Sequence, residues 1–383
     1  MKKEQTLREP FVRMVKRDAM PGWQRACIYA LALLLALIVC SAVIVAFTGL
    51  NPVTVFKTMF ETTFGTPDLA WKNRAMSIWT TVRDTMILLC VALALVPAFR
   101  MRFWNIGGEG QILVGGLATA FAMRQFGDAM PTWLLFTCMV CFSLLAGMVW
   151  GLLPAVFKAF WNTNETLFTL MMNYIAIQIV SAFSILWEAK QGSGSIGVIN
   201  KATKAGHMTT SWLSGAFGTK NYIIDVMIVL ALTILIFVYM KYTKHGYELT
   251  VVGESGNTAR YAGINVRRVI IRTMALSGAL CGLAGFILVS GSSHTISTNT
   301  AGGRGFTAII VAWLAKFNPF MMIVISFFLV FMDYGAKGVA TSCGLNKAFS
   351  DIITGIILFF VLGCEVFINY KVRFRHGKRR IDA

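Results

Sequence analysis

The sequence predicts an all-α integral membrane protein, and three observations lead to this fold class. Of its 383 residues, 56% are hydrophobic and only 14% are charged, whereas soluble proteins carry about 25% charged residues. Residues 26–48 contain no charged side chain and, as a helix, are long enough to cross the hydrocarbon core of a bilayer. Similar blocks recur along the whole chain, so we expect about ten transmembrane helices.

The first block, 26–48, follows basic residues, as the apolar region of a signal peptide does. It is too long for such a region, and no small-residue cleavage site with a polar domain behind it follows. We therefore expect a retained first span. The later blocks are 85–99, 110–123, 129–157, 166–187, 226–240, 273–303, 305–315, 317–332 and 352–364.

Two of these blocks are short for a membrane crossing. Block 110–123 has 14 residues and block 305–315 has 11, where a full span needs about 17 or more. Membranes tolerate short or re-entrant helices only where protein or a wet cavity covers them. Both blocks follow glycine-rich segments at matching positions, which predicts two pseudo-symmetric halves with a binding site between them.

The net charge of +18 indicates orientation rather than nucleic-acid binding. With ten crossings and a cytoplasmic N-terminus, the cytoplasmic segments hold 22 of the 35 Lys and Arg residues, and the outer segments hold 12. The positive-inside rule therefore predicts that both termini are cytoplasmic. We expect the basic surface to meet membrane lipid, and no nucleic acid.

The same crossings give the domain organisation. We expect a basic cytoplasmic N-terminus (1–25), a single transmembrane domain (26–370) and a basic cytoplasmic tail (371–383). Within the domain, 188–220 is rich in Gly, Ser, Thr and Lys and is expected to be an extracytoplasmic loop with a short helix around Trp212. Residues 241–268 form the main cytoplasmic loop.

The sequence carries none of the common signatures of catalysis. The sequence contains no GxxxxGK(S/T) phosphate loop, no HExxH and no GxSxG motif, and it has only four His residues. We therefore expect no catalytic residue, no metal site and no enzymatic activity on this chain.

Polar residues accompany two of the helices. In RFWNIGGEGQ, residues 102–111, Asn105 is expected to cap a helix with Glu109 in its first turns. Asn105, Glu109 and Gln111 then either only end that helix or line a polar path. In NETLFTLMMNY, residues 164–174, Asn164 is the expected cap, and Asn173 either bonds a neighbouring helix or contacts cargo.

Two further segments complete the pattern. Residues 246–287 predict a short helix near 255–262, bounded by Gly253 and Gly263, and then close helix packing at Gly278, Gly282 and Gly285. Residues 302–320 lead from glycines into a short apolar helix, whose Phe306 and Thr307 join the candidate path residues.

Together these segments resemble the permease subunits of ATP-binding-cassette importers, in the ribose and branched-chain amino acid permease superfamily. The nucleoside and simple-sugar branch is the most similar. The matching residues are Trp104 to Gly107, Glu109 to Gln111, Asn164, Glu165, Thr169 to Met171, Asn173, Tyr174, Ala259, Gly263, Ile264, Leu276 to Gly278, Gly303, Gly305, Phe306, Ala308 and Ile309. Trp104 departs from the usual Phe, Arg260-Tyr261 follow Ala259, and Ala312-Trp313 replace a small pair, so Trp313 is expected to affect substrate size.

The resemblance implies partners. They are a second permease chain, expected to form a heterodimer with this one, ATPase chains that bind ATP and Mg, and an extracellular substrate-binding lipoprotein. This chain itself then needs no cofactor, and its place is the bacterial cell membrane. The coupling residues implied in the cytoplasmic loop are Gly253, Glu254, Asn257, Ala259, Gly263 and Ile264.

The expected function is half of a translocation pathway for a nucleoside, driven by ATP. A simple sugar or a flavin-like solute is the alternative cargo. A different class, an ion-coupled secondary carrier, needs a titratable group at mid-membrane, and Asp225, Asp333 and Asp351 lie near expected helix ends.

Overall fold

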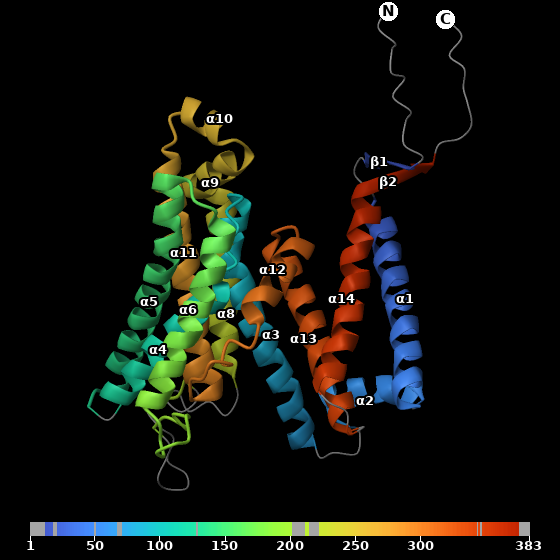
Figure 1. The fold of residues 1–383 in the computed structure, drawn as a ribbon, viewed down its shortest axis with the longest axis horizontal. Helices are drawn as coiled ribbons and strands as arrows, with labels where there is room; N and C mark the ends of the chain where they lie inside the picture. Colours follow the sequence, from blue (N-terminus) through green and yellow to red (C-terminus); the bar gives the residue numbers. More distant parts are fainter. Residues whose placement is uncertain are drawn as a thin grey trace, which may run out of the picture. The chain divides into compact units, whose positions relative to one another are not determined.

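The computed structural model describes residues 12–17, 21–49, 51–66, 71–127, 129–200, 211–213, 222–342, 344 and 347–374 (Figure 1). Across these residues the chain is helical, apart from irregular connections and one two-stranded sheet that the all-α expectation did not include. Residue contacts divide it into two units, one of Met1–Asp68 with Met332–Ala383 and one of Leu69–Phe331. Each unit is described by itself.

The first unit is built on two long helices, α1 (Gly22–Thr48) and α14 (Lys347–Asn369), which pack along each other. It also holds α2 (Pro52–Phe64), the end of α13 (Pro319–Ser342), and strands β1 (Val12–Lys16) and β2 (Tyr370–Phe374). The two strands pair antiparallel, with Val12 opposite Phe374. Ala32, Cys364 and Ile368 are buried between the helices, and the Tyr29 hydroxyl donates a hydrogen bond to the Glu365 carboxylate.

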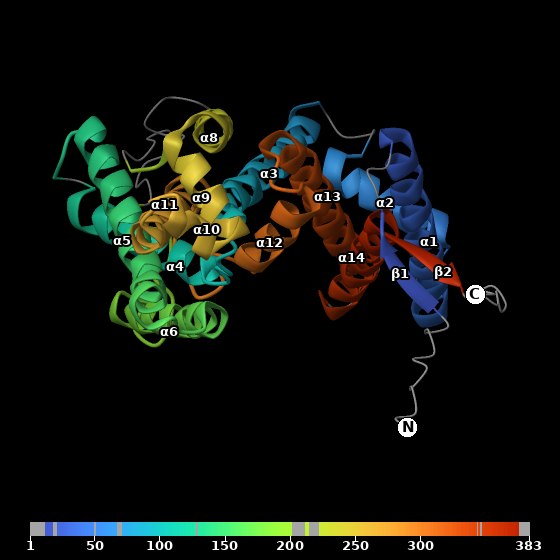
Figure 2. The same cartoon turned by 90° about the horizontal axis from the view of Figure 1, so that it is seen from above.

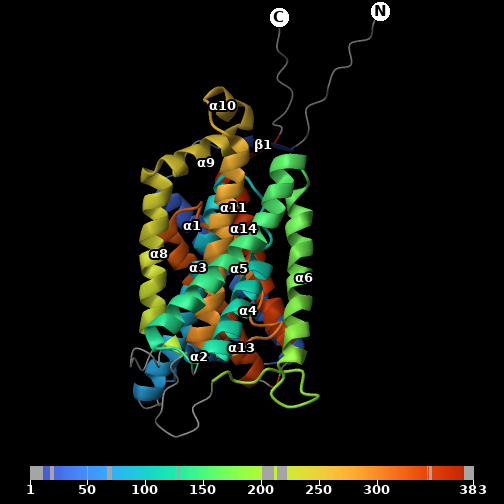
Figure 3. The same ribbon diagram turned by 90° about the vertical axis from the view of Figure 1, so that its left-hand side faces the viewer.

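The second unit contains the remaining helices and the first part of α13. They are α3 (Trp71–Arg100), α4 (Gly108–Phe126), α5 (Thr132–Trp161), α6 (Glu165–Leu186), α8 (Ile223–Tyr242), α9 (Lys244–Glu254), α10 (Gly256–Tyr261), α11 (Val266–Phe286), the π-helical turn η1 (Ile287–Ser293) and α12 (Arg304–Leu314). Figure 3 shows α9 and α10 at one end of this unit and the segment after α6 at the other. We call these the α10 end and the loop end.

Glycines allow α4, α5 and α11 to pack closely (Figure 2). A Cβ added at Gly282 would lie 2.1 Å from the carbonyl oxygen of Ser143, and one at Gly147 would lie 2.3 Å from that of Gly278. A Cβ at Gly115 would lie 2.4 Å from the Cα of Gly282. In a membrane, where helices gain little from burying apolar surface, such backbone contact drives association. The expected close packing of α11 is confirmed.

Each of the ten expected blocks corresponds to a helix. Among the described residues, seven helices are long and apolar enough to cross a membrane: α1, α3, α5, α6, α8, α11 with η1, and α13. The chain is therefore a multi-pass membrane protein. Helix α12 has the expected 11 residues, whereas α4 reaches 19 residues because it continues past the uncharged block to include Glu109 and Arg124.

Candidate functional site

The chain crosses the second unit twice in its first part. Helix α3 ends at the α10 end, where a Cβ at Gly253 would lie 2.3 Å from the carbonyl oxygen of Arg100. Helix α4 then returns to the loop end, where Arg124 Nη1 donates to the carbonyl oxygen of Trp187 at 3.1 Å. Residues 101–107 make the irregular turn between the two helices.

The later return crossing is a broken helix. Helix α11 with η1 runs to the loop end, where His294 stacks on Trp212 with ring centroids 3.8 Å apart. Residues 294–303 are irregular, and α12 then reaches the α10 end, where Trp313 contacts Trp104. Only about half of this return path is helical.

Glu109 joins α4 to this broken helix. Its Oε1 accepts the backbone N–H of Gly303 and its Oε2 that of Gly305, each at 2.8 Å. The backbones also touch, since a Cβ at Gly305 would lie 2.4 Å from the amide nitrogen of Glu109. The N-termini of α4 and α12 therefore meet, and one carboxylate compensates the positive dipole ends of both helices.

Charged side chains tie the start of α12 to α3. Arg304 Nη2 lies 3.5 Å from Asp84 Oδ2, and Arg83 Nε lies 2.8 Å from Asp84 Oδ1. The Arg83 guanidinium also lies over the Tyr222 ring, 4.7 Å from its centroid. Because the Asp84 carboxylate is buried, this pairing offsets the cost of removing its charge from water.

Asn105 lies in a buried amide network rather than at the cap of α4. The cap residue is Gly107, which makes the expected capping role of Asn105 wrong. The chain turns once more after Asn105, so its Oδ1 accepts the Gly107 amide at 3.1 Å. Asn105 and Gln111 exchange two bonds of 3.3 Å, and Asn105 Nδ2 donates to Ser277 Oγ of α11 at 3.2 Å.

Asn173 bonds the same segment from α6. Its Oδ1 accepts the Gly110 amide at 2.8 Å, and its Nδ2 donates to the Ile106 carbonyl at 2.9 Å. Asn164 caps α6 as expected, because its side chain accepts the amides of Thr166 and Leu167. A helix-to-helix role for Asn173 is thereby confirmed.

The six candidate path residues gather around the start of α4 and α12, but they differ in exposure. The side chains of Asn105, Glu109, Gln111 and Asn173 are buried and bonded to protein groups. Phe306 is 44% exposed, and Thr307 is half-buried with its hydroxyl donating to the Gly303 carbonyl at 3.2 Å. The four buried residues form the framework of the site, while Phe306 and Thr307 of α12 are its more accessible side chains.

An aromatic pair lies beside this framework, and of its two residues only Trp313 was expected to affect the substrate. Trp104 and Trp313 stack with centroids 5.4 Å apart and ring planes 16° apart. Phe99 approaches both rings with T-shaped contacts at 6.0 and 6.2 Å, and Phe317 approaches Trp313 at 5.2 Å. In the sequence, Phe99 and Trp104 lie just before the first short block, and Trp313 and Phe317 lie at the end of the second. This placement beside both short blocks was the signal by which the cluster could have been found.

The expected short helix of the 241–268 loop is present as α10. Ser255 caps it by accepting the Thr258 amide at 3.2 Å, and Ala259 is its buried residue. Gly263 ends it with a φ of +76°, and the Ile264 amide donates to the Ala259 carbonyl at 2.9 Å. Of the other implied coupling residues, Gly253 is buried against α3, while Glu254 and Asn257 are exposed.

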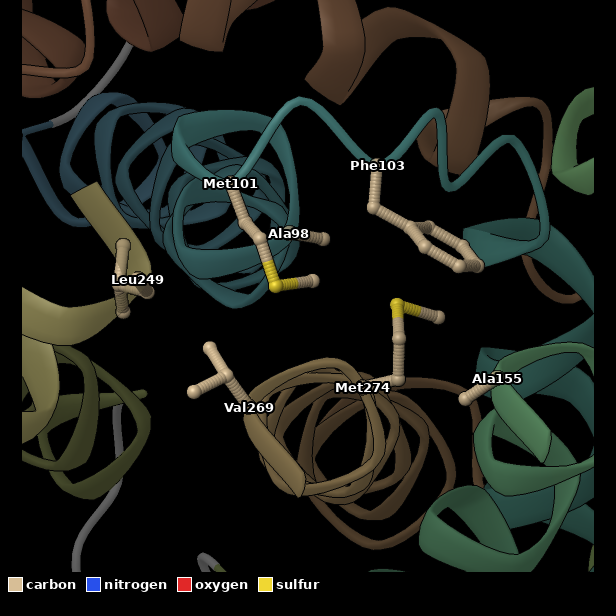
Figure 4. Close-up of a cluster of buried hydrophobic side chains, with 7 residues drawn as sticks. All are labelled: Ala98, Met101, Phe103, Ala155, Leu249, Val269 and Met274. Carbon is tan, nitrogen blue, oxygen red and sulfur yellow. The ribbon is translucent and has the colours of Figure 1, made fainter. Parts of the chain in front are cut away.

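A cluster of buried apolar side chains connects α9 to the segment that leads into α4. Figure 4 shows these side chains pointing toward one another from α3, α5, α9, α11 and the turn at 101–103. They are Ala98, Met101, Phe103, Ala155, Leu249, Val269 and Met274. Asn105 follows two residues after Phe103, so the cluster adjoins the amide network.

Residues 77–362, well over half of the chain, match the family described as "Branched-chain amino acid transport system / permease component". The chain belongs to this permease family. It is therefore a permease component of an ABC importer, a non-catalytic transmembrane subunit whose family implies ATPase and binding-protein partners.

Three relatives of this permease are similar over most of their length. The guanosine ABC transporter permease protein NupP of Bacillus subtilis is 29% identical, covering 78% of this chain and 83% of its own. The nucleoside ABC transporter permease protein NupB of Lactococcus lactis subsp. cremoris is 26% identical, covering 84% and 86%. The glucose ABC transporter permease protein TsgB13 of Haloferax volcanii is 25% identical, covering 96% and 95%.

Proposed function

We propose that this permease forms half of the translocation pathway of an importer that takes up a nucleoside. The observation that carries the choice of cargo is its similarity, over more than three-quarters of the chain, to permeases named for guanosine and for nucleosides. The broken helix α12, joined to α4 through Glu109, supports a site at the meeting point of two pseudo-symmetric halves.

The proposed topology has ten crossings, which are the seven long apolar helices together with α4, α12 and α14. Both termini and the α10 end then face the cytoplasm, in agreement with the distribution of Lys and Arg. The loop end faces the substrate-binding lipoprotein outside a bacterial cell. A second permease chain, different from this one, completes the pathway, and ATP with Mg binds to the ATPase chains.

In this proposal α10 is the element that meets the ATPase. Tyr261 is 94% exposed there, while Ala259 of the same helix is buried. Motion of α10 passes to α9, then through Leu249 to the apolar cluster around Met101 and Phe103. Because a close-packed cluster moves as a body, it carries the displacement to the start of α4.

Asn105, Glu109, Gln111 and Asn173 then act on the pathway by holding α4, α6, α11 and α12 in register. Phe306 and Thr307 are the candidates for direct contact with cargo, since they are the more exposed of the six.

Two alternative functions predict different results in an uptake experiment. A sugar or a flavin-like solute would use the same importer with another cargo. An ion-coupled carrier has one observation in its favour: Asp225 of α8 is only 2% exposed, and its Oδ1 has no hydrogen-bond partner among the described residues.

Whole-cell uptake with the chain and its neighbouring transport genes separates these possibilities. A host that takes up no nucleosides is supplied with labelled guanosine, glucose or riboflavin, with either the active ATPase or a variant lacking its phosphate-loop lysine. We expect guanosine uptake that depends on the active ATPase. Uptake of glucose or riboflavin alone would change the cargo, and uptake that persists with the inactive ATPase would indicate a carrier.

A further inference from the structure

One face of α12 carries exposed aromatic surface. Phe306 and Trp313 lie seven residues apart, which is two turns, so they lie on the same side of the helix. They are 44% and 43% exposed, although most of α12 is buried or half-buried. The surface therefore runs along the helix from its start beside Glu109 to its end at the α10 end.

Trp104 extends this surface across to the segment before α4. It is 44% exposed while one of its ring faces stacks on Trp313 at 5.4 Å. Phe99, which is only 3% exposed, and Phe317 support the pair with edge contacts. Two exposed indoles are thus fixed in a nearly parallel arrangement.

The backbone segments that carry Trp104 and Trp313 are also fixed by contacts with the rest of the unit. On the side of Trp104, Phe103 is 3% exposed in the core, and the Ile106 amide donates to Thr169 Oγ1 of α6 at 3.2 Å. On the side of Trp313, the start of α12 is bonded to Glu109. A surface fixed in this way offers contact area without first losing conformational entropy.

The position of this surface indicates what it faces. Backbone as irregular as residues 294–303 is excluded from hydrocarbon, so the crossing that contains α12 borders protein or a wet cavity. Exposed aromatic rings beside water bind the flat face of a base by stacking, whatever the base sequence or identity.

We propose that Trp104 and Trp313, with Phe306 further along α12, form an aromatic platform on which the base of the nucleoside stacks as it passes through the pathway. This inference rests on the proposed function and assigns two specificity-determining residues within it. The ribose is left free of the platform, so the platform favours cargo with a planar ring over a simple sugar.

The test uses the complete transporter in proteoliposomes, with saturating loaded binding protein so that delivery of cargo does not limit the rate. Uptake of guanosine is compared among the wild type, Trp104→Leu, Trp313→Leu, the double variant that combines these two changes, and Trp313→Phe. Trp133→Leu is the matched control, because Trp133 is 71% exposed on α5 and lies away from α12. The ratio of permease to partner chains is measured for each purified complex.

We expect Trp104→Leu and Trp313→Leu each to lower guanosine uptake about ten-fold, as for the loss of one stacking contact. The double variant should be little worse than either single variant, because the two rings act as one platform. Trp313→Phe should keep most of the rate, since it keeps a flat ring, and Trp133→Leu should leave the rate unchanged.

Three results would overturn the inference. Trp313→Leu with a wild-type uptake rate shows that the ring does not contact cargo. Loss of the second permease chain from the Trp313→Leu complex identifies the surface as a subunit interface. A Trp313→Phe variant as impaired as Trp313→Leu shows a role in packing rather than stacking. Failure of the wild type to take up guanosine would instead contradict the proposed function.

Discussion

Glu109 Oε2 accepts the backbone N–H of Gly305 at 2.8 Å, and this bond joins the first turn of α4 to the first turn of α12. Two helix N-termini that face each other repel, because each carries a partial positive charge. A carboxylate between them turns the repulsion into attraction and satisfies amide groups that a helix leaves unbonded. The only side chain at Gly305 that permits this approach is hydrogen.

Replacing Glu109 tests this arrangement. Glu109→Gln keeps the shape of the side chain but removes its charge and places an amide donor against a backbone N–H. Since a buried bond to a charged group contributes about 1.5–3 kcal/mol, we expect a loss of about 2 kcal/mol in the free energy of unfolding and a larger loss for Glu109→Ala.

Thermal unfolding in detergent measures the effect of both variants. Glu61→Gln is the matched control, because among the described residues Glu61 pairs with the largely exposed Lys57 at 3.7 Å, and such surface pairs contribute little. Equal stability of Glu109→Gln and Glu61→Gln would show that the carboxylate does not hold the two helices together.

The contact between α5 and α11 gives a second prediction. Gly282→Ala places a methyl group 2.1 Å from the Ser143 carbonyl oxygen, so the two backbones must separate. We expect the free energy of unfolding to fall by about 1–3 kcal/mol, as for overpacking. The control is Gly355→Ala on α14, where the added Cβ meets nothing within 4 Å. Equal unfolding temperatures for Gly282→Ala and Gly355→Ala would contradict the close packing.

The positions of the helices were largely predictable, because the bilayer imposes a length and an apolar composition on each crossing. Block 305–315 appears as α12 almost residue for residue. Helix α2 and the first half of α3 were not expected, since Lys57, Glu61, Lys72 and Arg83 interrupt the uncharged pattern there. The β1–β2 pair joins residues near opposite ends of the chain, and no local pattern indicates it.

The polar residues of the site could be predicted from the sequence, but their hydrogen-bond partners could not. Asn105, Glu109 and Asn173 stood out as polar residues in apolar surroundings, but the main partners of Glu109 are backbone amides of glycines nearly two hundred positions away. A glycine amide leaves no side-chain signal in a sequence. The extra turn at 105–107, which moves the start of α4 beyond Asn105, depends on contacts with α6 and α11. The local sequence does not indicate these contacts, so it predicts Asn105 as the helix cap.

Gly263 tests the coupling role of α10. Its φ of +76° suits glycine, whereas a β-branched side chain is strained there by about 1–3 kcal/mol. We expect Gly263→Val to distort the end of α10 and to lower uptake and cargo-stimulated ATP hydrolysis together, with normal insertion into the membrane. Gly256→Val, in open space with a negative φ, is the control. Undiminished uptake by Gly263→Val would remove α10 from the coupling route.

Guanosine uptake by the complete transporter in proteoliposomes, with ATP or ADP supplied on the ATPase side, tests the proposed function directly. If this chain is half of an ATP-driven pathway for nucleosides, labelled guanosine accumulates against its gradient with ATP and binding protein, and does not accumulate with ADP. Accumulation with ADP, driven by an imposed proton or sodium gradient, would contradict the account and identify the chain as a carrier.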